Sequence, residues 1–112
     1  RQSESKRILE KYPNRIPVII EKSGHCKKIG LVDKNKYLIP KDLSLGQLMY
    51  VIRKRLTLSS EQGMFLFINN TMIPVTQTMD FIYRNNHDED NFLYIVYIIL
   101  QVYLFMKIIH WI

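Results

Sequence analysis

The most reactive side chains in this sequence are one cysteine and three histidines, and they indicate little chemistry. Cys26 precedes two lysines whose charges favour a thiolate, but no His–Asp pair is placed to orient it. We therefore interpret Cys26 as a thiol without a catalytic role. The histidines lie in unlike segments without the spacing of metal ligands. They are His25, His87 and His110. Glycine-rich phosphate loops and paired carboxylates are also absent from the sequence, so we expect neither an enzyme nor a cofactor or metal.

Composition favours a single globular domain. The 112 residues are 47% hydrophobic and 23% charged, which suits one folded core. A single cysteine excludes an intrachain disulfide and fits a reducing compartment. Residues 1–11 lack the hydrophobic region of a secretory signal. A cytoplasmic location is therefore expected.

The net charge of +6 is unevenly distributed along the chain. Residues 1–56 carry +9, and residues 57–112 carry −3. Such a field favours acidic peptides or anionic membranes, although a merely solvated basic face is the alternative. Nucleic acid is a weaker candidate, because no recognised motif or aromatic stacking platform accompanies the charge.

The first half of the chain predicts a helix followed by strands. Residues 3–11 form a short helix that ends before Pro13, and residues 15–22 form a β-branched strand next to a turn at residues 23–24. Pro17 places part of that strand near an edge or a strand start. Residues 27–31 are extended, and residues 36–40 form an exposed edge strand that stops at Pro40.

The second half predicts two helices and two strands. Ser44 and Gln47 match a capping box, and the helix after them has an apolar face and a wet basic face. The apolar face holds Leu45, Leu48, Met49, Ile52 and Leu56, and the basic face Arg53, Lys54 and Arg55. Residues 64–68 predict a central strand buried on both faces, residues 78–83 a brief helix, and residues 92–97 a last strand. The order indicates an α+β fold of the β-grasp type, with one crossing helix, a mixed sheet and an amino-terminal helix.

Four separated segments carry a family resemblance. They are residues 11–19 (KYPNRIPVI), 33–40 (DKNKYLIP), 52–55 (IRKR) and 88–94 (DEDNFLY). In this order and spacing they resemble the autophagy ubiquitin-like modifiers, in the branches of the GABA-receptor-associated protein and the microtubule-associated light chains, over about residues 4–97. The resemblance implies a ubiquitin-like fold, a conjugation machinery that attaches the protein to phosphatidylethanolamine in autophagic membranes, and cargo receptors that carry acidic-aromatic peptides.

Two departures from the family change these expectations. The chain begins where the family's second helix would begin, so the first helix is expected to be absent or removed. The family also needs a glycine near its carboxyl end for conjugation, whereas the last glycine here is Gly63. Ordinary lipid conjugation is therefore not carried over.

The resemblance places a peptide-binding site along the edge strand. An edge strand binds extended peptides through backbone hydrogen bonds, while alternate side chains enter pockets. The aromatic pocket would involve Glu4, Ile8, Pro17, Ile19, Lys36, Leu38 and Phe92. The aliphatic pocket would involve Tyr37, Ile39, Pro40, Leu43, Leu48 and Val51. Acidic residues of the peptide would meet Arg15, Lys34, Lys36 and Arg55. The alternative for the apolar residues is that they only fill the core between helix and sheet.

Residues 98–112 form an atypical hydrophobic tail after residues 1–11 (helix) and 12–97 (ubiquitin-like domain). Three interpretations are open: an unusual splice or gene-model extension, a segment packed on the domain or in an oligomer, and a membrane anchor. A different function also stays open, in which the basic surface of a microtubule-associated protein binds acidic tubulin tails without conjugation.

Overall fold

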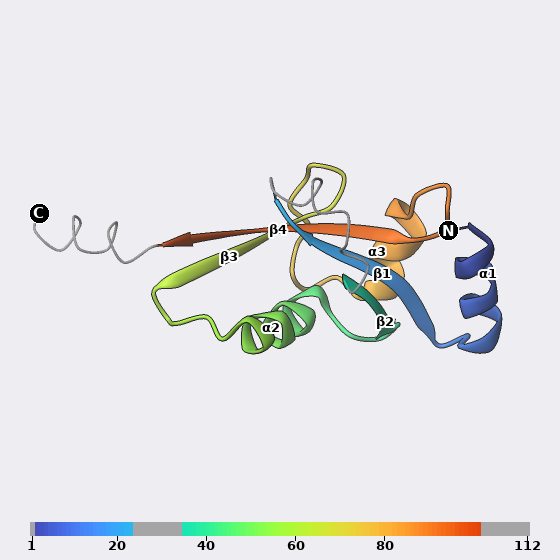
Figure 1. Cartoon of the computed structure of the whole chain (residues 1–112), viewed down its shortest axis with the longest axis horizontal. Helices are drawn as coiled ribbons and strands as arrows, with labels where there is room; N and C mark the ends of the chain where they lie inside the picture. Colours follow the sequence, from blue (N-terminus) through green and yellow to red (C-terminus); the bar gives the residue numbers. More distant parts are fainter. Residues whose placement is uncertain (1, 24–34, 102–112) are drawn as a thin grey trace, which may run out of the picture.

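The computed structural model describes residues 2–23 and 35–101 of the chain (Figure 1). Its elements follow the expected order of helix, two strands, helix, strand, helix and strand. They are α1 (Gln2–Lys11), β1 (Arg15–Lys22), β2 (Lys36–Pro40), α2 (Leu45–Leu56), β3 (Gln62–Phe67), α3 (Met79–Asn86) and β4 (Leu93–Gln101). The mixed sheet, the crossing helix and the amino-terminal helix confirm the predicted fold class. The expected extended run at residues 27–31 lies outside the described residues, as do Cys26 and residues 102–112.

The four strands form one sheet in the order β2-β1-β4-β3. The two outer pairs are antiparallel, and β1 and β4 are parallel. Parallel pairing begins at Val18 with Leu93, so Pro17 lies in the part of β1 that pairs only with β2. Because proline has no N–H, it is tolerated there, near the start of the strand, as expected.

The prediction of a central, doubly buried strand at residues 64–68 is wrong. The strand β3 is an edge strand, and its burial alternates: Met64 and Leu66 are buried, whereas Phe65 and Phe67 are half-buried. A continuous apolar run does not distinguish a central strand from an edge strand whose outer face is partly covered. The centre of the sheet is made by β1 and β4.

The helix α2 begins as its sequence predicts and packs across one face of the sheet. The Ser44 hydroxyl accepts from the Gln47 backbone N–H at 3.1 Å, and the Gln47 side chain accepts from the Ser44 N–H at 2.9 Å. The main core lies between α2, α3 and this face of the sheet. It contains Ile16, Val18, Ile20, Ile39, Leu45, Leu48, Ile52, Met64, Leu66, Ile68, Met79, Ile82, Leu93 and Ile95.

The expected wet face of α2 is only partly correct. Lys54 and Arg55 are exposed, but the Arg53 guanidinium donates to the Gln62 carbonyl at 2.7 Å and to the Ser59 carbonyl at 3.0 Å. Arg53 therefore ties the end of α2 to the loop before β3. Sequence periodicity did not indicate this, because the loop approaches the helix only in the folded chain.

The last strand continues further than expected. It begins at Leu93 and extends beyond Tyr97 to Gln101, so residues 98–101 belong to the sheet, where they pair with residues 62–65 of β3. Figure 1 shows β3 and β4 extending together past the end of β1. Within the part of the chain that the structure describes, no helix is long and apolar enough to cross a membrane.

Candidate functional site

The edge strand β2 directs backbone groups outward. Among residues 2–23 and 35–101, no strand pairs with its outer side. The Lys41 backbone N–H donates to the Asn14 carbonyl at 3.1 Å, and hydrogen-bonded pairs alternate along an antiparallel ladder. The pair Pro17 and Leu38 is therefore not hydrogen-bonded, in agreement with the missing N–H of Pro17. The N–H and carbonyl of Leu38, and those of Lys36 two residues before it, point to the open edge.

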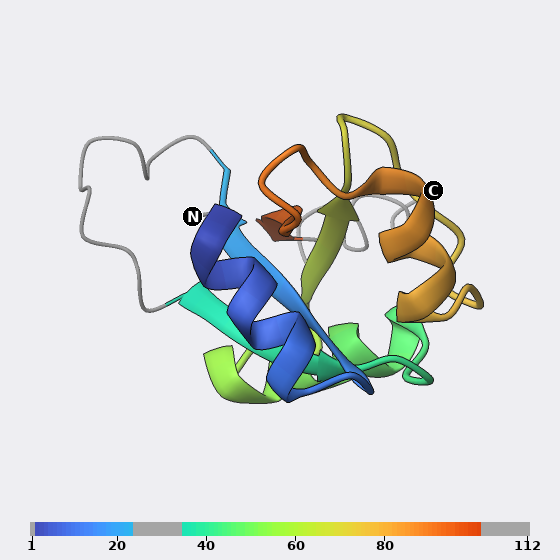
Figure 2. The same ribbon diagram turned by 90° about the vertical axis from the view of Figure 1, so that its right-hand side faces the viewer.

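The two faces of β2 face different helices. Tyr37 and Ile39 share the face of Val18 and Ile16, which is covered by α2. Lys36 points to the opposite face, where its ammonium group contacts Glu4 of α1. Figure 2 shows α1 crossing in front of β1 and β2, with α2 behind the sheet. The sheet thus separates most of the residues that the resemblance assigned to an aromatic pocket from those that it assigned to an aliphatic pocket. Pro40 is an exception, because it alternates with Ile39 and shares the face of Leu38. Lys36 and Leu38 also border the space on the α2 face.

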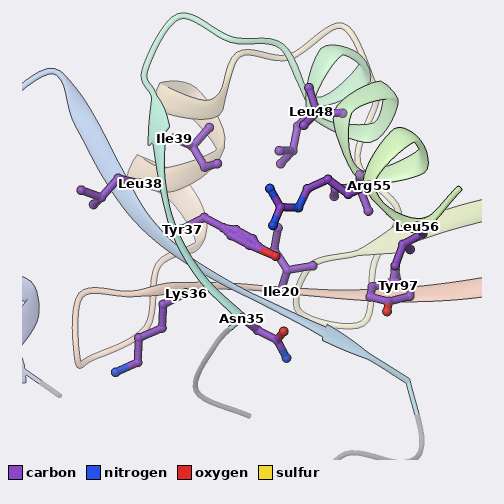
Figure 3. Close-up of a pocket in the computed structure, with 12 residues that line it drawn as sticks. Ile20, Asn35, Lys36, Tyr37, Leu38, Ile39, Leu48, Arg55, Leu56 and Tyr97 are labelled. Carbon is purple, nitrogen blue, oxygen red and sulfur yellow. The ribbon is translucent and has the colours of Figure 1, made fainter.

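On the α2 face, a cavity of about 530 Å³ lies between β2 and α2 (Figure 3). Several predicted site residues line it together: Lys36, Tyr37, Leu38, Ile39, Leu48, Val51 and Arg55. In Figure 3, Leu48 and Arg55 reach from α2 toward Tyr37 and Ile39 of β2. Val51 is 45% exposed at the helix surface, so an apolar group entering the cavity would cover it.

A cation lies at the mouth of this cavity. The Arg55 guanidinium carbon is 5.6 Å from the centre of the Tyr37 ring, a cation–π contact that holds both side chains. Arg55 is exposed. Arg55 can therefore donate hydrogen bonds to a carboxylate, while the ring of Tyr37 forms an apolar wall of the cavity.

On the α1 face, an ion pair joins the first helix to the edge strand. The Lys36 Nζ lies 3.1 Å and 3.2 Å from the two carboxylate oxygens of Glu4, and the side chains are 32% and 38% exposed. At such exposure the pair contributes little to stability, because solvent screens it. Its consequence is positional, because it links α1 to the edge strand β2.

The deeper residues predicted for the aromatic pocket are already covered. Pro17 is fully buried, Ile19 is 3% exposed and Phe92 is 1% exposed, while Ile8 of α1 is half-buried. These residues lie under α1 on the face opposite to the main core. An aromatic side chain could reach them only if α1 moved.

The remaining predicted residues lie at the periphery. Arg15 is exposed, and its guanidinium donates to the outward carbonyl of Leu38 at 3.3 Å. Pro40 ends β2 and is half-buried, and Leu43 packs against the core. Lys34 lies outside the described residues.

Sequence reasoning missed several residues that line the cavity. They are Ile20, Asn35, Ile52, Leu56 and Tyr97. Strand alternation from Ile16 through Val18 indicates Ile20, and helical spacing from Leu48 indicates Ile52 and Leu56. No local signal indicates Tyr97, because β4 reaches β1 only through parallel pairing.

Hydrogen bonds stabilise the turn before β4, which lies next to α1. The Asp90 carboxylate accepts from the Phe92 N–H at 3.0 Å and from the Tyr94 hydroxyl at 2.5 Å. The Tyr83 hydroxyl donates to the Asn91 carbonyl at 2.6 Å. Burial raises the pKa of Tyr83, and the negative charge of Asp90 raises it further. Among the described residues, no three His, Cys, Asp or Glu side chains are placed to hold a metal ion together.

The sheet, its crossing helix and its open edge strand define a ubiquitin-like protein. Comparison with known proteins identifies the family. The family model for the autophagy protein Atg8, described as ubiquitin-like, matches residues 1–103. The chain belongs to this Atg8 family of autophagy proteins.

Individual relatives agree with this assignment. The chain is 52% identical to autophagy-related protein 8a of Arabidopsis thaliana over 97 residues, which cover 87% of this chain and 79% of that protein. It is also 52% identical to autophagy-related protein 8A of Oryza sativa subsp. japonica, over 87% of this chain and 81% of that protein. The crystal structure of Trypanosoma brucei ATG8 superimposes with a TM-score of 0.77 at 39% identity, covering 89% of this chain and 85% of that one.

Proposed function

We propose that this chain is an autophagy adaptor that captures acidic-aromatic peptides of receptor proteins by adding them as a strand to β2. The observation that carries the proposal is the open edge of β2, whose outward N–H and carbonyl groups lie beside a cavity on one face and α1 on the other. Backbone pairing supplies affinity in this mode of recognition, and the pockets on alternate sides supply specificity.

Each part of the ligand has a counterpart in the site. An aliphatic side chain of the peptide enters the cavity between Tyr37 and Val51, and an aromatic side chain enters at Leu38 on the α1 face. Acidic residues beside the aromatic side chain pair with Lys36, and others pair with Arg55. The bound N–H groups of the peptide compete with Arg15 for the Leu38 carbonyl.

The partners in this proposal are autophagy receptors and adaptors that carry such peptides. The working location is the cytoplasm and the surface of autophagosomal membranes, in keeping with the family. The peptide-binding step uses only residues of β2 and of the helices beside it. It therefore does not depend on lipid conjugation.

Calorimetric titration with an acidic Trp-x-x-Leu peptide tests the proposal. We expect micromolar binding that is lost when both anchor residues of the peptide are alanine. The double variant Lys36→Ala, Leu38→Ala should abolish binding. The matched control removes the same side-chain types elsewhere, as Lys54→Ala with Leu100→Ala, since both residues are exposed outside the site.

Two results would contradict the assignment. If the site variant and the control variant bind equally well, the β2 site is wrong. If the alanine-substituted peptide binds as well as the original, negative charge alone determines binding, and the microtubule-associated function becomes the better explanation. Exposed basic residues such as Lys6, Arg7 and Lys11 on α1 would then be the contact surface.

A scan of the peptide with single N-methyl groups tests strand addition itself. The N–H groups of an added strand alternate between pairing with β2 and facing solvent. Methylation should therefore weaken binding at every second peptide residue and have little effect between them. A uniform effect, or none, would show that the peptide does not extend the sheet.

A further inference from the structure

Ser5 is the buried residue of α1, a helix whose other residues are half-buried or exposed. It is 0% exposed, and its hydroxyl oxygen lies 2.6 Å from the Asp90 carbonyl and 2.9 Å from the Gln2 carbonyl of its own helix. A hydroxyl has one proton, so it donates fully to only one of these acceptors. The shorter distance assigns the donation to Asp90, which lies 85 residues away in sequence.

This contact joins α1 to a hydrogen-bonded turn before β4. The Asp90 side chain is itself held by the Phe92 N–H and the Tyr94 hydroxyl. A second contact on the same side joins the Gln2 amide to the Glu89 carbonyl at 3.3 Å, but it is exposed. Of these two hydrogen bonds, the one from Ser5 is therefore the buried attachment of α1 to the turn before β4.

In this position α1 closes the aromatic half of the receptor site. It keeps Ile19 and Phe92 buried and holds Lys36 against Glu4. Burying an aromatic side chain requires about 150–250 Å² of contact surface. Ile19 and Phe92 cannot supply it while α1 covers them, so a ligand ring that uses them needs α1 to move outward.

We infer that Ser5 is a positioning residue of the receptor site, whose hydroxyl holds α1 closed over the aromatic pocket until a ligand displaces the helix. The inference rests on the proposed function. When α1 moves, the Ser5 proton transfers its hydrogen bond to the Gln2 carbonyl within the same helix, so the hydroxyl keeps a partner in both positions. An acidic residue of the ligand replaces Glu4 at Lys36, which couples ligand binding to opening.

Removing the Ser5 hydroxyl should increase the affinity for the peptide. If only the open state binds, the apparent dissociation constant is the intrinsic one divided by the open fraction. Ser5→Ala removes the hydrogen bond from Ser5 to the Asp90 carbonyl, which is made in the closed state alone, and so raises the open fraction. A lost hydrogen bond of this kind corresponds to about three- to tenfold in an equilibrium constant, so we expect affinity to increase by about that factor.

Association kinetics and hydrogen exchange distinguish this role from a purely structural one. We expect Ser5→Ala to increase the association rate with a Trp-x-x-Leu peptide, leave the dissociation rate unchanged, and speed amide exchange in α1. The effect should be larger for a Trp than for a Phe peptide, because a larger ring needs a wider opening. Ser3→Ala is the matched control, since Ser3 is an exposed serine of the same helix.

Different results contradict the role of Ser5 and the proposed function. An unchanged or slower association rate for Ser5→Ala, with normal binding by the wild type, overturns this inference alone. Absence of binding by the wild type overturns the proposed function and this inference with it. If Ser5→Ala does not fold, Gln2→Ala takes its place, because it weakens the same attachment at an exposed contact and should change the rate in the same direction by a smaller factor.

Discussion

Replacing Leu38 and Ile16 in turn should separate binding from stability. The two side chains lie on opposite faces of the β1–β2 pair: Leu38 is half-buried at the open edge, and Ile16 is 0% exposed in the core. Truncation of a fully buried isoleucine to alanine costs about 2–5 kcal/mol, whereas the partly covered Leu38 should lose roughly 1 kcal/mol. At about 4 °C per kcal/mol for a domain of this length, Ile16→Ala should lower Tm by about 8–20 °C, and Leu38→Ala by roughly 4 °C.

Peptide affinity should change in the opposite order. An anchor residue of an interface contributes about 2 kcal/mol or more, so Leu38→Ala should weaken Trp-x-x-Leu binding by roughly 30-fold. Ile16→Ala, measured at a temperature where it is folded, should weaken binding less than Leu38→Ala does, because Ile16 itself does not line the cavity, although its strand partner Ile39 does. Thermal denaturation and calorimetric titration of the same samples give both numbers. If Leu38→Ala loses stability as much as Ile16→Ala and keeps its affinity, Leu38 is a core residue and the site is misplaced.

Three further changes follow from the described contacts. Ser44→Ala removes the capping box of α2 and should cost about 1 kcal/mol of unfolding free energy in urea titrations, whereas Ser44→Asp should keep it. Arg55→Ala should weaken the binding of acidic peptides several-fold at low salt, and this loss of affinity should disappear at high salt. Lys54→Ala, at the neighbouring position of α2, should leave the affinity unchanged. Equal effects of the two variants would mean that only net charge matters. The raised pKa of Tyr83 means that the unfolded chain loses this proton first, so stability should fall as pH rises above about 10. Tyr83→Phe should reduce that alkaline loss in Tm measurements between pH 8 and pH 11, and an unchanged slope would refute the assignment.

Elements with local signals were predicted well. The strand at residues 15–22 matches β1 and the edge strand at 36–40 matches β2, because β-branched residues and a terminal proline determine both. The capping box placed the start of α2 correctly, since its hydrogen bonds are made within four residues. The helix at the amino terminus also matches, at residues 2–11.

Predictions that depended on distant neighbours were less complete. The apolar run at residues 64–68 has no feature that tells an edge from a centre, so its position in the sheet was wrong. The predicted last strand ends at Tyr97, four residues too early. Its pairing with β1 does stop there, but its pairing with β3 continues to Gln101. No local pattern in the sequence indicates that Ser5 is buried, because its partner Asp90 is 85 residues away.

The sequence alone therefore determined the elements, their order, the ubiquitin-like class and the family motifs around the edge strand. These depend on side-chain periodicity and capping, which act over a few residues. Only the tertiary structure decided which face of β2 each side chain occupies relative to α1 and α2, where the cavity lies, and that α1 covers Ile19 and Phe92. Those properties depend on contacts between segments far apart in the chain, which exist only after the sheet has formed and the helices have packed on it.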